Sequence, residues 1–469
     1  MSVEAGSTRW DTAIVWFRRD LRVADHPALA DALAHARTVV PLFVLDRQLL
    51  AAAAPARRWF LHHALAALDG ELRARGSGLL LRSGPAERVV AEVAREFGAD
   101  VVLATRDVTP FSHRRDRAVG AALEGDGRKL ALRPGLLLTE PESLRTASGK
   151  PYAVFTPFWR ALRPADRRRL EPAPGHIPTP EEVISQHAQL PLEPAPLPGL
   201  PEAGEQAAQQ RLATWTGGGL GAYGTQRDGL DGTGSSHLGA DLHFGTLSPL
   251  QVETATAASG EDAEPFMRQL GWREFYHHLL FHERSGDGGT ANPLEAAFRP
   301  EQDDPLAVEA WRTGRTGVPA VDAGMRQLVA TGWMSNRARL VVASYLTRQL
   351  LTDHRVGERF FLRHLVDGDV ANNRGGWRWV AGVGAVAQPW FRIFNPVRQG
   401  QRFDPEGTWV RRWLPELRDV DDRWVHSPWE APSPPPDYPR PIVDLAEGRA
   451  RALAAFKAAT SAGKDQRDD

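Results

Sequence analysis

TAIVWF, at residues 12–17, is a short run of apolar residues of the kind that forms a buried strand. The same signal returns in three later runs: TVVPLFVLD at 38–46, GLLLRSG at 78–84 and ADVVLAT at 99–105. Helical patterns separate these runs, for example at residues 57–76 and 85–98. Strands and helices that alternate at this spacing predict a doubly wound α/β domain with a parallel sheet. We expect this domain to occupy residues 1–140.

The pattern changes after residue 140. Proline is dense between residues 171 and 204, which indicates an extended connector and not a packed element. We place the connector at residues 141–210. From residue 211 apolar residues recur at three- and four-residue steps, which predicts an all-helical domain at 211–457. Residues 458–469 are expected to be a frayed polar tail.

Composition limits the classes of function. The chain has no cysteine, so it has no disulfide and no cysteine metal site, as is usual in a reducing cytoplasm. The net charge is −1, so a nucleic-acid site would have to be a local basic patch. The N-terminal apolar run, residues 13–17, is too short for a signal peptide or a membrane span. We expect a cytoplasmic, monomeric protein with no membrane partner.

Three segments contain residues that are suited to chemistry. GTGSSHLGADLHFGTLSP, at 232–249, places small hydroxyl residues before a helical run, which suits a phosphate, although a plain capped loop explains it as well. WMSNRARL, at 333–340, is either an exposed helix start or part of a site. DGDVANNRGGWRW, at 367–379, contains two indoles that a surface turn does not explain, because large rings usually require burial. His278 and His282 have helical spacing but no HExxH pattern, so we predict no metal site.

The order of the segments is more specific than any one of them. Eight segments, which together extend over nearly the whole chain, closely resemble the DNA photolyase/cryptochrome family, and bacterial class I cyclobutane pyrimidine dimer photolyases most of all. They are WFRRDLRVADHPAL (16–29), YAVFTPFWR (152–160), LHFGTLSP (242–249), QLGWREFY (269–276), GRTGVPAVDAGMRQL (314–328), TGWMSNR (331–337), residues 367–379 and FRIFNPVRQGQRFDPEGTWVRRWLPEL (391–417).

The resemblance implies that the helical domain binds FAD in a U-shape, at the bottom of a cavity that opens onto a DNA-binding face. The residues that match the segment around the diphosphate and ribityl chain are Tyr223, Ser235, Ser236, His237, Leu238 and Gly239. The residues that match the flavin and ribose contacts are Arg339, Asp367, Gly368, Asp369 and Asn373. Among these, Asn373 matches the residue that faces flavin N5, and Arg339 the base that pairs with Asp367.

The resemblance also implies sites for DNA and for electron transfer. Trp272 and Trp379 match the rings that flank an extruded dimer. The other residues that match or neighbour lesion- and DNA-facing positions are Arg227, Gln269, Arg273, Tyr276, Asn336, Arg337 and Gln399. The implied catalytic residues are Gln269, Trp311, Asn373 and Trp377, of which Trp377 is the indole nearest the flavin.

The activity implied is light-driven repair of cyclobutane pyrimidine dimers in DNA, a carbon–carbon lyase reaction, by electron transfer from reduced FAD. A cryptochrome-like photoreceptor without repair activity is the alternative, and a second antenna chromophore of folate or deazaflavin type is left open. His354 stands where the family has the middle tryptophan of an electron-transfer chain, and Ala385 and Val386 replace a polar pair at the lesion rim. Imidazole is harder to oxidise than indole. We therefore expect an interrupted path from Trp377 to Trp311, which we place at the surface.

Overall fold

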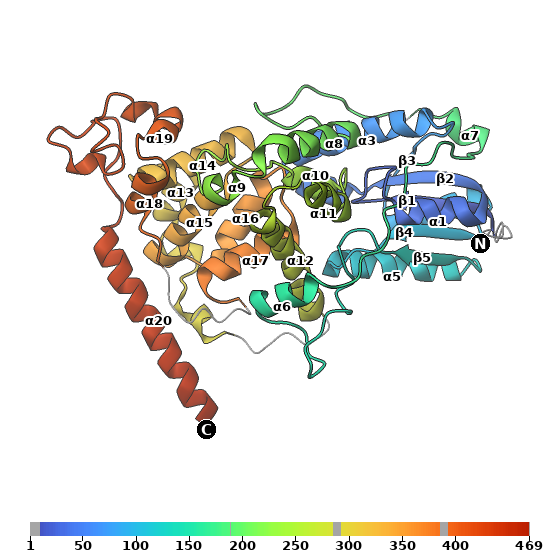
Figure 1. Ribbon diagram of the computed structural model, residues 1–469. Coiled ribbons are helices and arrows are strands. Elements are labelled where there is room, and N and C mark those ends of the chain that lie inside the picture. Colours follow the sequence, from blue (N-terminus) through green and yellow to red (C-terminus); the bar gives the residue numbers. More distant parts are fainter. Residues whose placement is uncertain (1–9, 188, 285–291, 385–392, 469) are drawn as a thin grey trace.

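The computed structural model describes residues 10–187, 189–284, 292–384 and 393–468. Ala385, Val386 and Trp390 lie outside the described residues. Figure 1 shows a sheet with its helices at one end of the molecule and a helical body at the other. The predicted fold class, an α/β domain followed by a helical domain, is confirmed.

The α/β domain contains a parallel sheet of order β3-β2-β1-β4-β5. Its strands are β1 (Trp10–Phe17), β2 (Ala36–Leu45), β3 (Leu80–Ser83), β4 (Val101–Thr105) and β5 (Lys129–Arg133). Its helices are α1 (Pro27–His35), α2 (Arg47–Ala52), α3 (Pro55–Arg73), α4 (Ala86–Glu96) and α5 (Pro110–Glu124). Both faces of the sheet are covered, as parallel sheets require.

Strand β1 explains why the first apolar run is continuous. Val15 and Phe17 pack on one face of the sheet with α1 and α3, whereas Ile14 and Trp16 pack on the other face with α4 and α5. Successive side chains of a strand point to opposite faces, so a strand buried on both faces needs apolar residues at every position. The apolar run thus encodes the central strand of a two-faced sheet.

After β5 the described residues form helices joined by loops and extended segments. The first helices are α6 (Phe155–Leu162), α7 (Glu181–Ile184), α8 (Glu205–Thr214), η1 (Trp215–Gly219), α9 (Tyr223–Gln226), α10 (Gly239–Phe244), α11 (Pro249–Ala258) and α12 (Glu264–Arg284). They are followed by η2 (Pro293–Ala297), η3 (Glu301–Asp303), α13 (Pro305–Thr313), α14 (Pro319–Thr331), α15 (Asn336–Ser344), η4 (Tyr345–Gln349), α16 (His354–His364) and α17 (Val370–Ala381). The last are α18 (Pro396–Phe403), α19 (Thr408–Trp413), η5 (Pro415–Leu417), η6 (Pro428–Glu430) and α20 (Leu445–Asp468).

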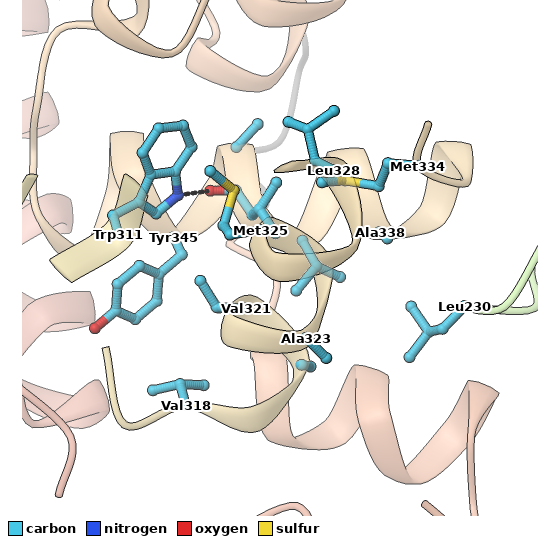
Figure 2. Packing of buried hydrophobic residues seen from close by; sticks show 14 of the residues in the cluster. Leu230, Trp311, Val318, Val321, Ala323, Met325, Leu328, Met334, Ala338 and Tyr345 are labelled. Atoms are coloured by element: carbon cyan, nitrogen blue, oxygen red, sulfur yellow. Dashed lines mark hydrogen bonds between the residues drawn. The ribbon is translucent and has the colours of Figure 1, made fainter. Parts of the chain in front are cut away.

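The main core of the helical domain lies among α13, α14, α15, α17 and α19. Figure 2 shows Trp311 and Tyr345 beside Val321 and Met325 in this core. The Trp311 indole N–H donates to the Val342 carbonyl at 3.0 Å, which satisfies the one polar group of a fully buried ring.

The proline-dense segment differs from the expected unpacked connector. It is extended apart from the single turn of α7, but Ile177 and Val183 are fully buried in the cores on the two faces of the sheet. Backbone hydrogen bonds join Ile177 to Arg75 and Val39 to Pro178. Proline removes donors, but it does not prevent neighbouring residues from packing an extended chain onto a domain.

Residues 458–468 of the expected polar tail continue helix α20, which ends at Asp468 and extends away from the helical body (Figure 1). The first half of α20 is anchored through Ala452 and Phe456, which pack against Leu351. The segment contains no proline and several alanines, so helix propensity favours continuation of the helix into the polar end of the chain.

Candidate functional site

A cavity of about 410 Å³ lies between α10, α12, α15, α16 and α17. Its volume is within the range of about 300–1,000 Å³ that is usual for ligand pockets. The sequence-predicted residues that line it are Gly239, Gln269, Trp272, Arg273, Tyr276, Asn336, Arg339, Asp367, Gly368, Asp369, Asn373, Trp377 and Trp379. The fold therefore gathers segments more than 100 residues apart into one cavity.

Helix α17 carries the segment with the two indoles. Asp369 is its N-cap and accepts a hydrogen bond from the Asn372 N–H at 2.8 Å. Asn373 and Trp377 are four residues apart and therefore share the face of α17 that lines the cavity. A Cβ on Gly375 would overlap the Tyr276 ring, so glycine is needed where α12 and α17 approach closely.

An ion pair forms the polar side of the cavity. One terminal nitrogen of Arg339, Nη2, lies 3.1 and 2.9 Å from the two carboxylate oxygens of Asp367, as expected for this pair. A Cβ on Gly239 would lie 2.6 Å from Asp367 Oδ2, so α10 can begin here only with glycine. The Asn373 side-chain N–H donates to the Glu358 carbonyl at 3.0 Å, which fixes the orientation of the amide.

Aromatic rings form the apolar side of the cavity. Trp272 stacks on Phe155 with ring centroids 3.8 Å apart and planes at 8°. Trp377 is buried and meets Phe361 edge-on at 4.9 Å. The cavity is thus lined by flat apolar rings opposite a charged pair, which is an environment suited to a planar ligand with a polar tail.

The predicted phosphate segment is divided between two places. Gly239 reaches the cavity, whereas Ser235, Ser236 and His237 line a second cavity of about 840 Å³ behind the same loop. Leu238 is buried in a neighbouring core, where Tyr223 also packs, and burial raises the pKa of Tyr223 to about 12. Sequence spacing could not separate these residues, because a loop turns its successive side chains in different directions.

Of the predicted DNA-facing residues at positions 227, 336, 337 and 399, only Asn336 lines the cavity. Arg337 pairs with Asp228 at 2.7 Å and donates to the Gln399 side-chain oxygen at 3.3 Å. Asn336 is exposed at the start of α15, and Arg227 lies over the Tyr223 ring. We refer to Arg227, Asn336, Arg337 and Gln399 as the rim residues.

Two sequence-predicted roles require correction. Arg273 lines the cavity, but its guanidinium is buried and engaged by Glu274 at 2.8 Å and by the Leu136 carbonyl at 3.0 Å. It therefore links the two domains, and its charge is already paired within the protein. Trp311 is fully buried, not a surface residue, and its ring contacts Trp377 directly, with centroids 6.2 Å apart.

The contact between Trp377 and Trp311 changes the expected electron path. Because the rings of Trp377 and Trp311 are in contact, an electron can pass between them directly. This step does not need a tryptophan at position 354. We expect Trp311→Phe to slow the photoreduction of oxidised FAD several-fold, because transfer rates fall steeply with distance and with the difficulty of oxidising the ring. Flavin absorbance under identical light and reductant measures the rate.

Trp409→Phe is the matched control for Trp311→Phe, since Trp409 is also buried and hydrogen-bonded in this core but bonds to Gln327. His354→Trp should accelerate photoreduction if a second path through α16 is used. An unchanged rate in Trp311→Phe would exclude the contact as the route.

Buried histidines predict acid sensitivity. Burial lowers the pKa of His278 and of His354 to about 4, below the ordinary value near 6.5. Between pH 6.5 and 4 the unfolded chain binds more protons than the folded one, so stability falls as the pH falls. From pH 7 to pH 5 each group should lower the free energy of unfolding by about 1–2 kcal/mol. Denaturant unfolding at both pH values measures the loss.

In the same experiment, the free energy of unfolding of His354→Phe should decrease less between pH 7 and pH 5 than that of the wild type, because the contribution of His354 is absent. The exposed His187→Gln serves as control and should leave the pH dependence as it is. An equal loss of stability in wild type and His354→Phe would contradict the assignment.

Sequence reasoning missed several residues of the site. Arg19 and Arg57, from the α/β domain, reach the Asp367–Asp369 segment, and the cavity wall also includes Leu242, His243, Phe361, Leu365 and Val380. The position of Arg19 just after the central strand was an available signal, because ligand sites of parallel sheets lie beyond the carboxyl ends of the strands.

The residues present suit a flavin dinucleotide. Carboxylates at Asp367 and Asp369 can accept from ribose or flavin N–H and O–H groups, and Arg339 supplies a positive charge. The buried nitrogen His243 Nδ1 near the cavity has no hydrogen-bond partner among the described residues, and His277 Nε2 lies 3.5 Å from Asp369 Oδ2. In the described ranges no group of three or more His, Asp or Glu side chains is arranged to hold a metal, and no helix is long and apolar enough to cross a membrane.

Two family models and a curated relative match this chain. Residues 13–179 match the model described as DNA photolyase, and residues 266–458 match the model described as the FAD binding domain of DNA photolyase. A curated relative from Agrobacterium fabrum, named deoxyribodipyrimidine photo-lyase, is 40% identical over 95% of this chain and 97% of its own.

Two solved structures have the same overall fold. A bacterial class III photolyase from Agrobacterium tumefaciens superposes with a TM-score of 0.88 at 39% identity, covering 98% of this chain and 100% of that one. A cryptochrome from Synechocystis superposes with a TM-score of 0.85 at 29% identity, covering 95% of this chain and 99% of that one. Assignment to class I rather than class III stays a prediction. On this evidence the chain belongs to the DNA photolyase family and contains the FAD-binding domain of that family.

Proposed function

We propose that this protein repairs cyclobutane pyrimidine dimers in DNA with light absorbed by bound FAD. The observation that carries the proposal is the single cavity that joins the Arg339–Asp367 pair and Asn373 to the rings of Trp272 and Trp379. Curated relatives from Agrobacterium fabrum and Escherichia coli, at 40% and 36% identity, are named deoxyribodipyrimidine photo-lyase. These names support repair over the photoreceptor alternative.

The polar side of the cavity would hold the cofactor. Asp367, Gly368, Asp369 and Arg339 would contact flavin and ribose. As the resemblance implies, the 235–239 loop would contact the phosphates, with Gly239 on the first cavity and Ser235, Ser236 and His237 on the second. Bound FAD in its reduced form would supply, on excitation by light, the electron that splits the cyclobutane ring and that is then returned. The protein contributes binding, orientation and exclusion of water.

The aromatic side of the cavity would hold the dimer. A dimer is poorly stacked in a duplex, so extruding it costs less than extruding normal bases. Phe155 stacks on the Trp272 ring and orients it. Because Trp272 also lines the cavity, a base could stack on it there. Gln269 lines the same cavity and can hydrogen-bond a thymine edge.

The rim would hold the DNA backbone. Asn336 lines the cavity, and its neighbour Arg337 is hydrogen-bonded to Gln399, so these two residues and Arg227 would contact phosphates beside the cavity. Because arginine contacts to phosphate release counterions, binding should weaken steeply with salt for damaged and undamaged DNA alike. We further propose that the protein is cytoplasmic, with which the absence of cysteine is compatible. We also propose that it is a monomer.

Light-dependent reversal of a defined dimer tests the function. The reduced protein is mixed with an oligonucleotide that contains one dimer, and the dimer is quantified after illumination and after an equal time in the dark. Loss of the dimer only in the light supports repair. A protein that holds FAD but leaves the dimer intact in both conditions would instead be a photoreceptor.

A further inference from the structure

The Asp367–Asp369 segment is contacted by two arginines that belong to the other domain. Arg19 lies two residues beyond the end of β1, and Arg57 lies in the first turn of α3. Both elements are part of the α/β domain, which the proposed function does not otherwise involve in the FAD site.

Arg19 distributes its guanidinium over three acceptors. One terminal nitrogen lies 2.6 Å from Asp369 Oδ2, and the other lies 3.5 Å from Asp107 Oδ2. The Nε–H donates to the His243 carbonyl at 3.1 Å. Since Asp107 and His243 come from different domains, the side chain is held from both sides while it points at Asp369.

Arg57 approaches the same segment from α3. Its Nη1 donates to the Leu365 carbonyl at 2.8 Å. A Cβ on Gly368 would lie only 2.5 Å from that nitrogen, so the glycine between the two aspartates makes room for the guanidinium. Burial lowers the pKa of Arg57 to about 10, and the charge of Asp367 opposes the shift.

Asp369 depends on these charges. Burial alone would raise the pKa of Asp369, but the charges of His277 and Arg19 outweigh it and hold the pKa well below its ordinary value. Asp369 is also the N-cap of α17, the helix that carries Asn373 and Trp377. A displaced carboxylate would therefore disturb both the ion pairs and the start of that helix.

We propose that Arg19 and Arg57 are positioning residues of the FAD site: through Asp369 and Gly368 they set the conformation and the charge of the segment that contacts the cofactor. The inference rests on the proposed function, because it takes the cavity to hold FAD. It assigns the α/β domain a part in binding FAD that is separate from any antenna role.

FAD affinity of the apo-protein tests the proposal. Arg19→Gln and Arg57→Gln remove the charges and keep polar side chains, and each should weaken FAD binding about ten-fold or more, as measured by FAD fluorescence. Arg19→Lys restores the charge and should bind FAD more tightly than Arg19→Gln. The visible absorption of bound FAD, which reports the polarity around the ring, should shift in Arg19→Gln and return toward wild type in Arg19→Lys.

Arg168→Gln is the matched control. Arg168 has a similar exposure to Arg19 and pairs with buried Asp25, which also bonds to Ser248 of the helical body, but it does not touch the 367–369 segment. Unchanged affinity in both arginine variants, or an equal loss in Arg168→Gln, would overturn the proposal and leave the function standing. A wild type that binds no FAD would overturn the proposed function itself.

Discussion

Trp272→Ala should bind a dimer-containing duplex about ten-fold or more weakly than wild type, with little change for undamaged DNA. Trp272 lines the cavity and stacks on Phe155 at 3.8 Å, so its ring is already ordered before a ligand arrives. A preordered ring loses little conformational entropy on stacking, and one base–aromatic stack contributes about 1–3 kcal/mol. Undamaged DNA stays stacked in its duplex and does not use this contact.

Anisotropy titrations at two salt concentrations measure the effect. Both affinities should fall with salt, because rim contacts to phosphate are electrostatic, but the ratio of damaged to undamaged binding should persist. Trp59→Ala is the control, since Trp59 lies in α3 and bonds to the Glu193 carbonyl away from the cavity. Equal affinity of the wild type for both duplexes, together with no reversal in light, would favour the photoreceptor.

Asp367→Ala should lower FAD affinity about ten-fold or more. Hydrogen bonds to charged groups contribute about 1.5–3 kcal/mol, and both carboxylate oxygens of Asp367 lie within 3.1 Å of Arg339. The substitution removes a cofactor contact and also leaves a partly buried guanidinium without that partner. The purified variant should contain less flavin per protein, as its visible absorbance relative to that at 280 nm will show.

Asp228→Ala is the control for this experiment. It also removes the carboxylate of an arginine pair, with Arg337 at 2.7 Å, but Asp228 does not line the cavity. Its FAD content should match that of wild type. A colourless, folded wild type that fails to take up added FAD would contradict the cofactor assignment.

Most site residues were assigned through the resemblance, because helical spacing alone indicates a shared face and not its role. Gln269, Trp272 and Tyr276 match lesion-facing positions of the family, and their steps of three and four residues place them on one face of α12, where they line the cavity. Asp369 and Asn373 likewise came from the resemblance, and the structure places them at the cap and in the first turn of α17. The pairing of Arg339 with Asp367 came from the resemblance, and the structure places the two side chains together.

Helical periodicity does not predict which distant residues a side chain contacts or whether neighbouring helices bury it. Arg273 shares its helix face with Trp272 and Tyr276, yet its charge is engaged by Glu274 and a carbonyl of the α/β domain. Trp311 was placed at the surface, but the packing of α13 against α14 and α15 encloses it and brings it to Trp377. Both outcomes depend on the positions of elements distant in sequence.

The sequence by itself determined the two-domain architecture, because buried strands and amphipathic helices carry their period in the order of their residues. It also determined the chemistry available at the cavity, through the residue types of α12, α15 and α17. Only the tertiary structure decided which charges meet there. Arg19 and Arg57 reach the Asp367–Asp369 segment across more than 300 positions, because the carboxyl end of β1 and the start of α3 dock against the start of α17. That docking comes from the packing of whole domains, which no local pattern records.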